Sequence, residues 1–136
     1  MEHNEVFHIL ICGGRHFDNY TLLESTVTNY LIQQGIKNKN LEIVSGHCPG
    51  ADLLGEKFSK EHKTALRVFP AQWTRYGKAA GPLRNKEMIN YLSSFDNKLV
   101  IAFVSPNSKG TRNTIALARK LKINVIEIAY EVKEKK

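Results

Sequence analysis

Hydrophobic residues follow two alternating patterns along this chain, and the alternation predicts the order of its secondary structure. Short apolar runs rich in β-branched residues predict buried strands, whereas stretches with apolar residues at helical spacing predict amphipathic helices. The predicted strands cover residues 6–12, 41–45, 65–69, 99–104 and 124–128. The predicted helices cover residues 21–34, 51–62, 82–94 and 111–121.

Strands that alternate with helices indicate parallel strands joined by crossover helices. Strands that are apolar on both faces are typical of a sheet covered by helices on both sides. We therefore expect an α/β protein: a Rossmann-like three-layer sandwich whose five-stranded, mainly parallel sheet has the order 3-2-1-4-5. Since no linker or repeat interrupts the pattern, we expect one domain over residues 1–130, followed by a charged C-terminal tail at 131–136.

The composition agrees with a soluble globular domain. The chain has 136 residues, of which 42% are hydrophobic and 24% charged. No apolar run approaches the ~18 residues of a membrane span, so we expect no membrane association. The polar first residues do not resemble a secretory signal, and Cys12 and Cys48 are the only cysteines. We therefore expect a cytoplasmic protein with reduced thiols.

Charge leaves the partner open. The net charge of +7 keeps nucleic acid as an alternative, but the basic residues are scattered rather than clustered. Scattered positive charge also suits a small phosphorylated ligand, which we favour. The histidines and cysteines lack the spacing of metal sites, so we expect neither a metal nor a cofactor. A homo-oligomer is left open.

Glycine and polar residues gather in the segments that follow the predicted strands. In a parallel sheet these segments meet at one edge, where ligands bind. Gly13-Gly14-Arg15 follows the first strand; it suits either phosphate binding or a tight turn with a solvated arginine. The second strand is followed by Ser45-Gly46 and Gly50-Ala51-Asp52. Asp52 either complements a helix dipole, binds a ribose hydroxyl or acts as an acid.

The third and fourth strands are followed by two further candidate loops. The long segment 69–85 contains the only tryptophan, and aromatic and cationic groups together suit a base and its phosphates. We expect Trp73 or Tyr76 to border the pocket, with a core position for Trp73 as the alternative. Arg84-Asn85 should point to the same edge. Segment 105–111 could hold a phosphate through its amides and hydroxyls, or Thr111 could simply cap a helix.

These segments together resemble one known family. The residues that carry the resemblance are Gly13-Gly14-Arg15, Ser45-Gly46, Gly50-Ala51-Asp52, Phe69-Pro70-Ala71, Gly77 to Asn85 and Ser108 to Thr111. They are similar to the SLOG superfamily, in its YspA/YpsA-related branch, which is related to LOG-type phosphoribohydrolases and to DprA. The resemblance implies a Rossmann-like SLOG domain with a pocket for a nucleotide or an ADP-ribose-like ligand.

The resemblance leaves the activity open. LOG-type enzymes carry a glutamate in a PGGxGTxxE loop, and Thr114 stands at that position here. We therefore expect a sensor, carrier or sequestering module. The alternative is an N-glycosidic hydrolase in which Asp52 replaces the glutamate and Arg84 assists, and DprA-like binding of single-stranded DNA is a third interpretation. The predicted ligand-binding residues are Gly13, Gly14, Arg15, Ser45, Gly46, Gly50, Asp52, Trp73, Arg84, Asn85, Ser108, Gly110 and Thr111.

Overall fold

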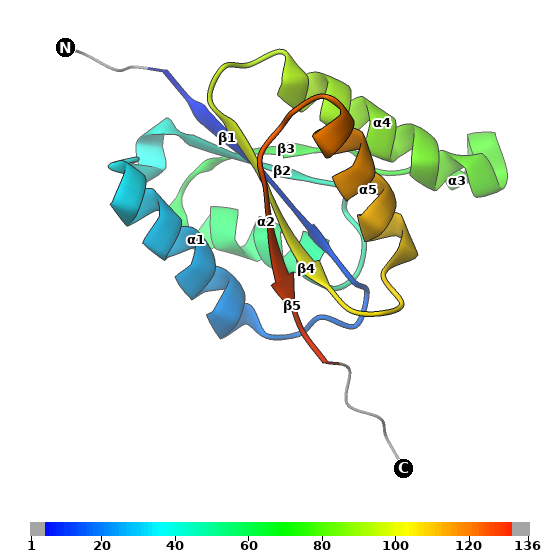
Figure 1. Cartoon of the computed structure of the whole chain (residues 1–136), viewed down its shortest axis with the longest axis horizontal. Coiled ribbons are helices and arrows are strands. Elements are labelled where there is room, and N and C mark those ends of the chain that lie inside the picture. The colour runs from blue at the N-terminus through cyan, green and yellow to red at the C-terminus, as the bar shows by residue number, and fades with distance from the viewer. Residues whose placement is uncertain (1–4, 132–136) are drawn as a thin grey trace.

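A computed structural model describes residues 5–131 as one sheet between two layers of helices (Figure 1). The strands are β1 (Phe7–Gly13), β2 (Leu41–Ser45), β3 (Ala65–Val68), β4 (Lys98–Val104) and β5 (Val125–Ala129). The helices are α1 (Tyr20–Gln34), η1 (Asn38–Asn40), α2 (Ala51–His62), α3 (Trp73–Tyr76), η2 (Gly77–Ala79), α4 (Ala80–Ser93) and α5 (Lys109–Lys120). All strand pairs are parallel and the order is β3-β2-β1-β4-β5, which confirms the predicted Rossmann-like fold.

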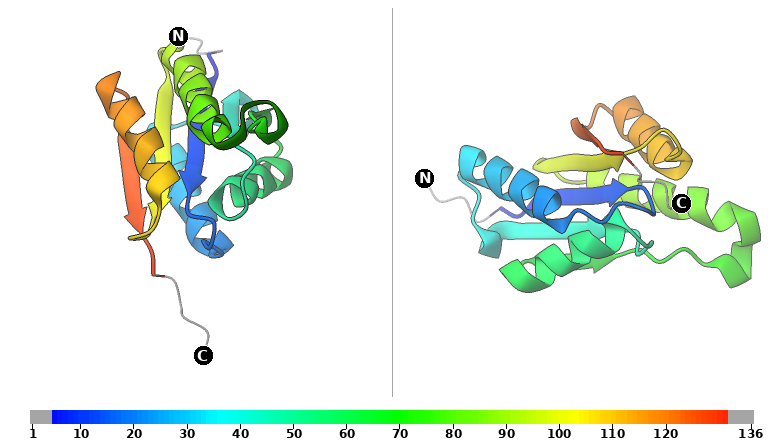
Figure 2. Two further views of the ribbon diagram at one scale, coloured as in Figure 1. Left: turned by 90° about the vertical axis from the view of Figure 1, so that its right-hand side faces the viewer. Right: turned by 90° about the horizontal axis from the view of Figure 1, so that it is seen from below.

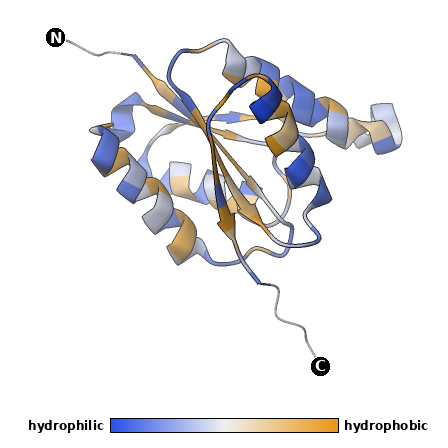
Figure 3. Cartoon of the chain, in the orientation of Figure 1, coloured by the Kyte–Doolittle hydropathy of each residue, from blue (hydrophilic) through white to orange (hydrophobic). Residues whose placement is uncertain are grey.

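Two apolar layers hold the helices on the sheet. Alternate residues of each strand point to opposite faces, so Ile9 packs toward α1 and α2 while Leu10 packs toward α4 and α5. The helices cover both faces of the sheet (Figure 2). The strands are the most hydrophobic elements, and the polar residues of the helices turn outward (Figure 3). Because all strand pairs are parallel, the carboxyl ends of the five strands lie at the same edge of the sheet.

α2 starts at Ala51 as predicted, whereas α1, α4 and α5 start one or two residues before their predicted positions. Asn19 caps α1, because its side chain accepts a hydrogen bond from the Leu22 N–H at 3.0 Å. Ser108, and not Thr111, occupies the N-cap of α5.

The segment predicted as one long loop contains α3, η2 and the first turn of α4. Pro82 fits that first turn because its missing N–H would have no intrahelical partner there.

No helix within residues 5–131 is long and apolar enough to cross a lipid bilayer. Of the predicted charged tail, only Glu131 belongs to the described part of the chain; residues 132–136 lie outside it.

Candidate ligand-binding site

A cavity of about 1040 Å³ opens at the carboxyl edge of the sheet, where β1 and β4 lie side by side. Its walls come from the β1–α1 loop, the start of α2, the α3–α4 segment, the β4–α5 loop and residues 130–131. Small-molecule sites have volumes of roughly 300–1,000 Å³, so a nucleotide-sized ligand fits here. The strand order reverses between β1 and β4, which is where ligands bind in open parallel sheets.

Most of the predicted ligand-binding residues line this cavity: Gly13, Gly14, Arg15, Asp52, Trp73, Arg84, Asn85, Ser108, Gly110 and Thr111. Trp73 is half-exposed, so its alternative position in the core is wrong, and Tyr76 does not line the cavity. The loops after β1 and β4 line the same cavity.

Three predicted residues do not line the cavity, and their contacts hold Asp52, Arg84 and the start of α2 instead. Ser45 donates hydrogen bonds to the Glu56 carboxylate at 2.8 Å and to the Asp52 carbonyl at 3.2 Å. The Gly46 carbonyl accepts a hydrogen bond from Arg84. Gly50 has a φ of 89°, a conformation that favours glycine, and this turn starts α2. The structure therefore gives these residues a supporting position.

Gly13, the last residue of β1, and Gly14, which follows it, lack a side chain because the protein packs closely around them. A Cβ on Gly13 would lie 2.6 Å from the Phe103 carbonyl oxygen and 2.7 Å from the Ala51 Cβ. The Gly14 N–H donates to the Phe103 carbonyl at 3.0 Å, so it is already used by the protein. Close packing within the protein explains why neither position carries a side chain, and phosphate binding at these glycines stays a prediction.

The N-terminus of α5 is a part of the cavity wall whose chemistry suits an anion. The Ser108 hydroxyl accepts from the Ser105 N–H at 3.0 Å and makes no capping bond to the helix. The first N–H groups of a helix have no intrahelical partners, so those of Gly110 and Thr111 are available to a ligand. Together with the helix dipole they favour a phosphate or carboxylate. The positively charged side chains of Arg15 and Lys109 line the same cavity and are exposed to solvent.

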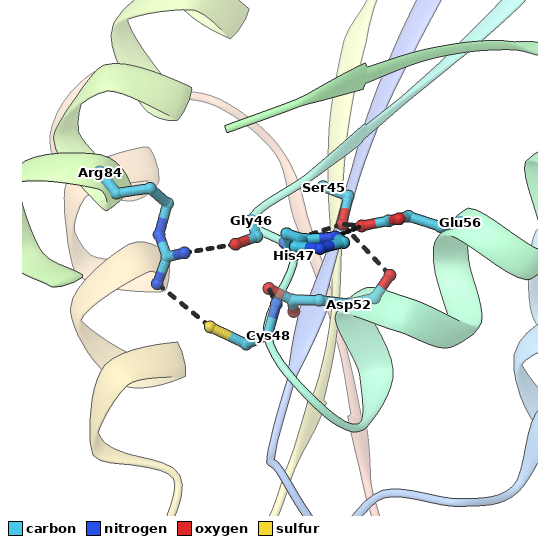
Figure 4. Close-up of polar contacts among 7 residues, drawn as sticks. All are labelled: Ser45, Gly46, His47, Cys48, Asp52, Glu56 and Arg84. Atoms are coloured by element: carbon cyan, nitrogen blue, oxygen red, sulfur yellow. Dashed lines mark hydrogen bonds and ion pairs between the residues drawn. The ribbon is translucent and has the colours of Figure 1, made fainter. Parts of the chain in front are cut away.

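The Asp52 carboxyl and the Arg84 guanidinium line another part of the cavity. Figure 4 shows the polar contacts around them. Asp52 and Arg84 are 5% and 7% exposed, respectively. Arg84 donates to the Gly46 carbonyl, to Asn85 Oδ1 at 2.9 Å and to Cys48 Sγ at 3.4 Å. These bonds hold the guanidinium against the β2–α2 loop, so Arg84 is not free to reach far into the cavity.

Burial changes the chemistry of the Asp52 carboxyl. Loss of solvent raises its pKa to about 6, although the Cys48 N–H, which donates to it at 3.2 Å, and the Arg84 charge oppose the shift. A carboxyl with a pKa near neutrality exchanges protons readily, which suits acid–base chemistry. Burial also raises the pKa of the neighbouring Cys12 thiol, so this cysteine stays protonated.

Tyr130, Cys12 and Cys48 also line the cavity and were not among the predicted ligand-binding residues. Tyr130 directly follows β5 and reaches the same edge of the sheet as the other four loops. Tyr130 could have been predicted from the sequence, because residues that follow the fifth strand lie at the same edge of the sheet as those that follow the other four.

An all-parallel, doubly wound sheet with a cavity at its switch point defines the Rossmann-like class of α/β ligand-binding domains. The model of the YspA, cpYpsA-related SLOG family (YAcAr) matches residues 7–76, which are 70 of the 136 residues. The chain therefore belongs to this SLOG family, as its motifs predict. The match includes Gly13, Asp52 and Trp73 and ends before Arg84 and the α5 N-terminus. No curated protein and no solved structure matched the chain.

Proposed function

We propose that the protein binds a nucleotide or a nucleotide-derived ligand, such as ADP-ribose, and acts as a sensor, carrier or sequestering module. The observation that carries this proposal is the uncapped N-terminus of α5, which faces a nucleotide-sized cavity with Arg15 and Lys109. Membership of the SLOG family supports a nucleotide-related role.

The cavity walls suggest how such a ligand would be held. Its phosphate would accept hydrogen bonds from the α5 N-terminal amides. A ribose hydroxyl would donate to the Asp52 carboxylate, and the base would lie against the exposed half of Trp73. We also propose a cytoplasmic location, where Cys12 and Cys48 would stay reduced.

Trp73 fluorescence tests the proposal directly, because Trp73 is the only tryptophan. Titration with AMP or ADP-ribose should quench its emission. Arg15→Ala removes a charge-assisted bond to phosphate and should weaken AMP binding by about tenfold or more. Arg119→Ala, on an arginine outside the cavity wall, should leave it unchanged. Unchanged fluorescence and no measurable affinity for either probe would contradict the proposal.

Single-stranded DNA binding is distinguished by its salt dependence. Contacts to several phosphates make affinity fall steeply as salt rises, whereas one phosphate contact gives a shallow slope. We expect a shallow slope for AMP and no strong binding of oligonucleotides.

N-glycosidic hydrolysis is a second candidate function, favoured by the buried Asp52 carboxyl with its pKa of about 6. Cleavage of a ribosyl bond builds positive charge on the sugar, which a nearby carboxylate stabilises while water attacks and the base leaves with a proton. Thr114 cannot supply that carboxylate; its hydroxyl donates to the Gly110 carbonyl at 3.3 Å. Free base detected by chromatography with wild type, and lost in Asp52→Asn with ligand affinity retained, would establish this activity. We expect no release.

A further inference from the structure

Tyr130 is held firmly at one side of the cavity. Its N–H donates to the Val104 carbonyl at 3.0 Å, which continues the β4–β5 pairing beyond the end of β5. Its ring packs edge-on against Phe17, with 5.0 Å between ring centroids, and Phe17 in turn stacks on Phe103 at 4.5 Å. Backbone and ring contacts therefore orient the side chain without help from its hydroxyl.

The Tyr130 hydroxyl lies directly over Gly14. A Cβ on Gly14 would be 1.8 Å from Tyr130 Oη and 3.0 Å from Ser108 Oγ. The hydroxyl is thus placed between the β1–α1 loop and the loop that starts α5. Gly14 does not have a positive φ, so the absence of a side chain there is explained by the approach of Tyr130.

Nothing within residues 5–131 forms a hydrogen bond with this hydroxyl. The nearby Ser108 Oγ is engaged with the N–H and the hydroxyl of Ser105, each at 3.0 Å. A phenol at the wall of a cavity normally binds a partner through its polar end, and Tyr130 lines the cavity. Ser108 precedes α5, and the first amides of that helix favour an anion.

We propose that the Tyr130 hydroxyl donates a hydrogen bond to a phosphate oxygen of the ligand and so selects phosphorylated over unphosphorylated ligands. This inference rests on the proposed function, since it assigns the anionic end of the same ligand. A neutral donor beside the α5 amides adds directionality to a site in which Arg15 and Lys109 supply charge from exposed positions. A role in covering Gly14 alone would need only the ring, which phenylalanine also provides.

The test is calorimetric titration of wild type, Tyr130→Phe and Tyr30→Phe with AMP, adenosine and inorganic phosphate. Tyr30→Phe is the matched control, because Tyr30 lies on α1 and outside the cavity wall. Tyr130→Phe should weaken AMP and phosphate binding about tenfold, the effect of one hydrogen bond to a charged group. Adenosine affinity should not change, and Tyr30→Phe should match wild type with every probe.

Each other outcome has a separate meaning. Equal AMP and phosphate affinities in wild type and Tyr130→Phe would overturn the role of Tyr130 while leaving nucleotide binding intact. An equal loss for adenosine would also overturn it, because the hydroxyl would then serve packing. Phosphate binding that depends on Tyr130, without any binding of AMP or ADP-ribose, would support the inference and refute the proposed function. A wild type that binds neither these nucleotides nor phosphate would refute both.

Discussion

The two ends of the sheet treat their polar side chains in opposite ways. At the amino end, His8 Nδ1 lies 2.7 Å from a Glu42 carboxylate oxygen, and the Tyr91 hydroxyl donates to that carboxylate at 2.8 Å. The His8 ring stacks on Phe95 with 3.6 Å between centroids. Every one of these polar groups has a partner within the protein.

At the carboxyl end, donors face the cavity instead. Ser108 leaves α5 uncapped, and the Tyr130 hydroxyl has no partner among the described residues. Burial raises the pKa of the Asp52 carboxyl to about 6, because its contacts within the protein do not fully stabilise the negative charge. Polar residues alone therefore do not mark a binding site. The polar side chains described at the amino end bond to one another, whereas the carboxyl end has polar groups without a partner among the described residues.

The largest expected difference between the two ends is the loss of stability when a glycine with positive φ is replaced by alanine. A Cβ on Gly50 would lie 2.2 Å from the Gly14 carbonyl oxygen, whereas one on Gly35 meets nothing within 4 Å. Gly50→Ala should therefore lower the free energy of unfolding by about 4 kcal/mol, from strain and overpacking together. Gly35→Ala should cost about 1 kcal/mol, from strain alone. Urea unfolding measures both, and equal costs would contradict the packing described for the carboxyl end.

Asp52 should make the carboxyl end sensitive to pH. Its folded pKa of about 6 lies above the unfolded value, so the folded state binds the proton more tightly. Its contribution is therefore most favourable below about pH 4 and is lost as pH rises through 6, a change of about 3 kcal/mol. Urea unfolding of Asp52→Asn should show a flatter profile than wild type across this range. A profile that is parallel to wild type would show that Asp52 does not titrate as described.

The amino-end cluster should affect stability and not binding. Glu42→Ala removes the partner of both His8 and Tyr91 and should lower the free energy of unfolding by about 2 kcal/mol. Burial, followed by the bond to Glu42, raises the pKa of Tyr91 to about 12, so this pKa should fall in the variant. Absorbance titration of tyrosine follows it. AMP affinity at a temperature where the variant is folded should equal that of wild type, and a loss would break the contrast between the two ends.

The smallest expected effect is at the rim of the cavity. Glu131 is exposed and lines the cavity near Tyr130, where its charge opposes an anion. Glu131→Gln should tighten AMP binding about twofold at low salt, and the gain should disappear as salt rises. Glu87→Gln, an exposed position outside the cavity wall, should have no effect in the same calorimetric titrations.

Much of the fold was predictable because alternating apolar periods constrain a parallel sheet strongly. The start of α4 was not, since Gly81-Pro82 is typical of a break and is tolerated here only because it falls in the first helical turn. For the candidate site, the position of Asp52 at the start of α2 followed from local pattern.

The reason for a glycine at position 14 could not be predicted from the local sequence pattern. Its close neighbour Tyr130 lies at the other end of the chain, and only the folded sheet brings the two together. The Asp52 pKa depends likewise on burial that no local pattern reports.

The central position of β1 has a consequence for synthesis on the ribosome. β1 is made first, yet it pairs with β4 through contacts such as His8 with Lys98, so one of its edges stays unpaired until most of the chain has emerged. Contacts so distant in sequence slow folding, and an uncovered apolar strand edge invites aggregation. A nascent chain released after residue 76 would hold three of the five strands and would lack Arg84, Ser108 and Tyr130. We therefore expect β1 to gain its second neighbouring strand only after β4 has left the ribosome.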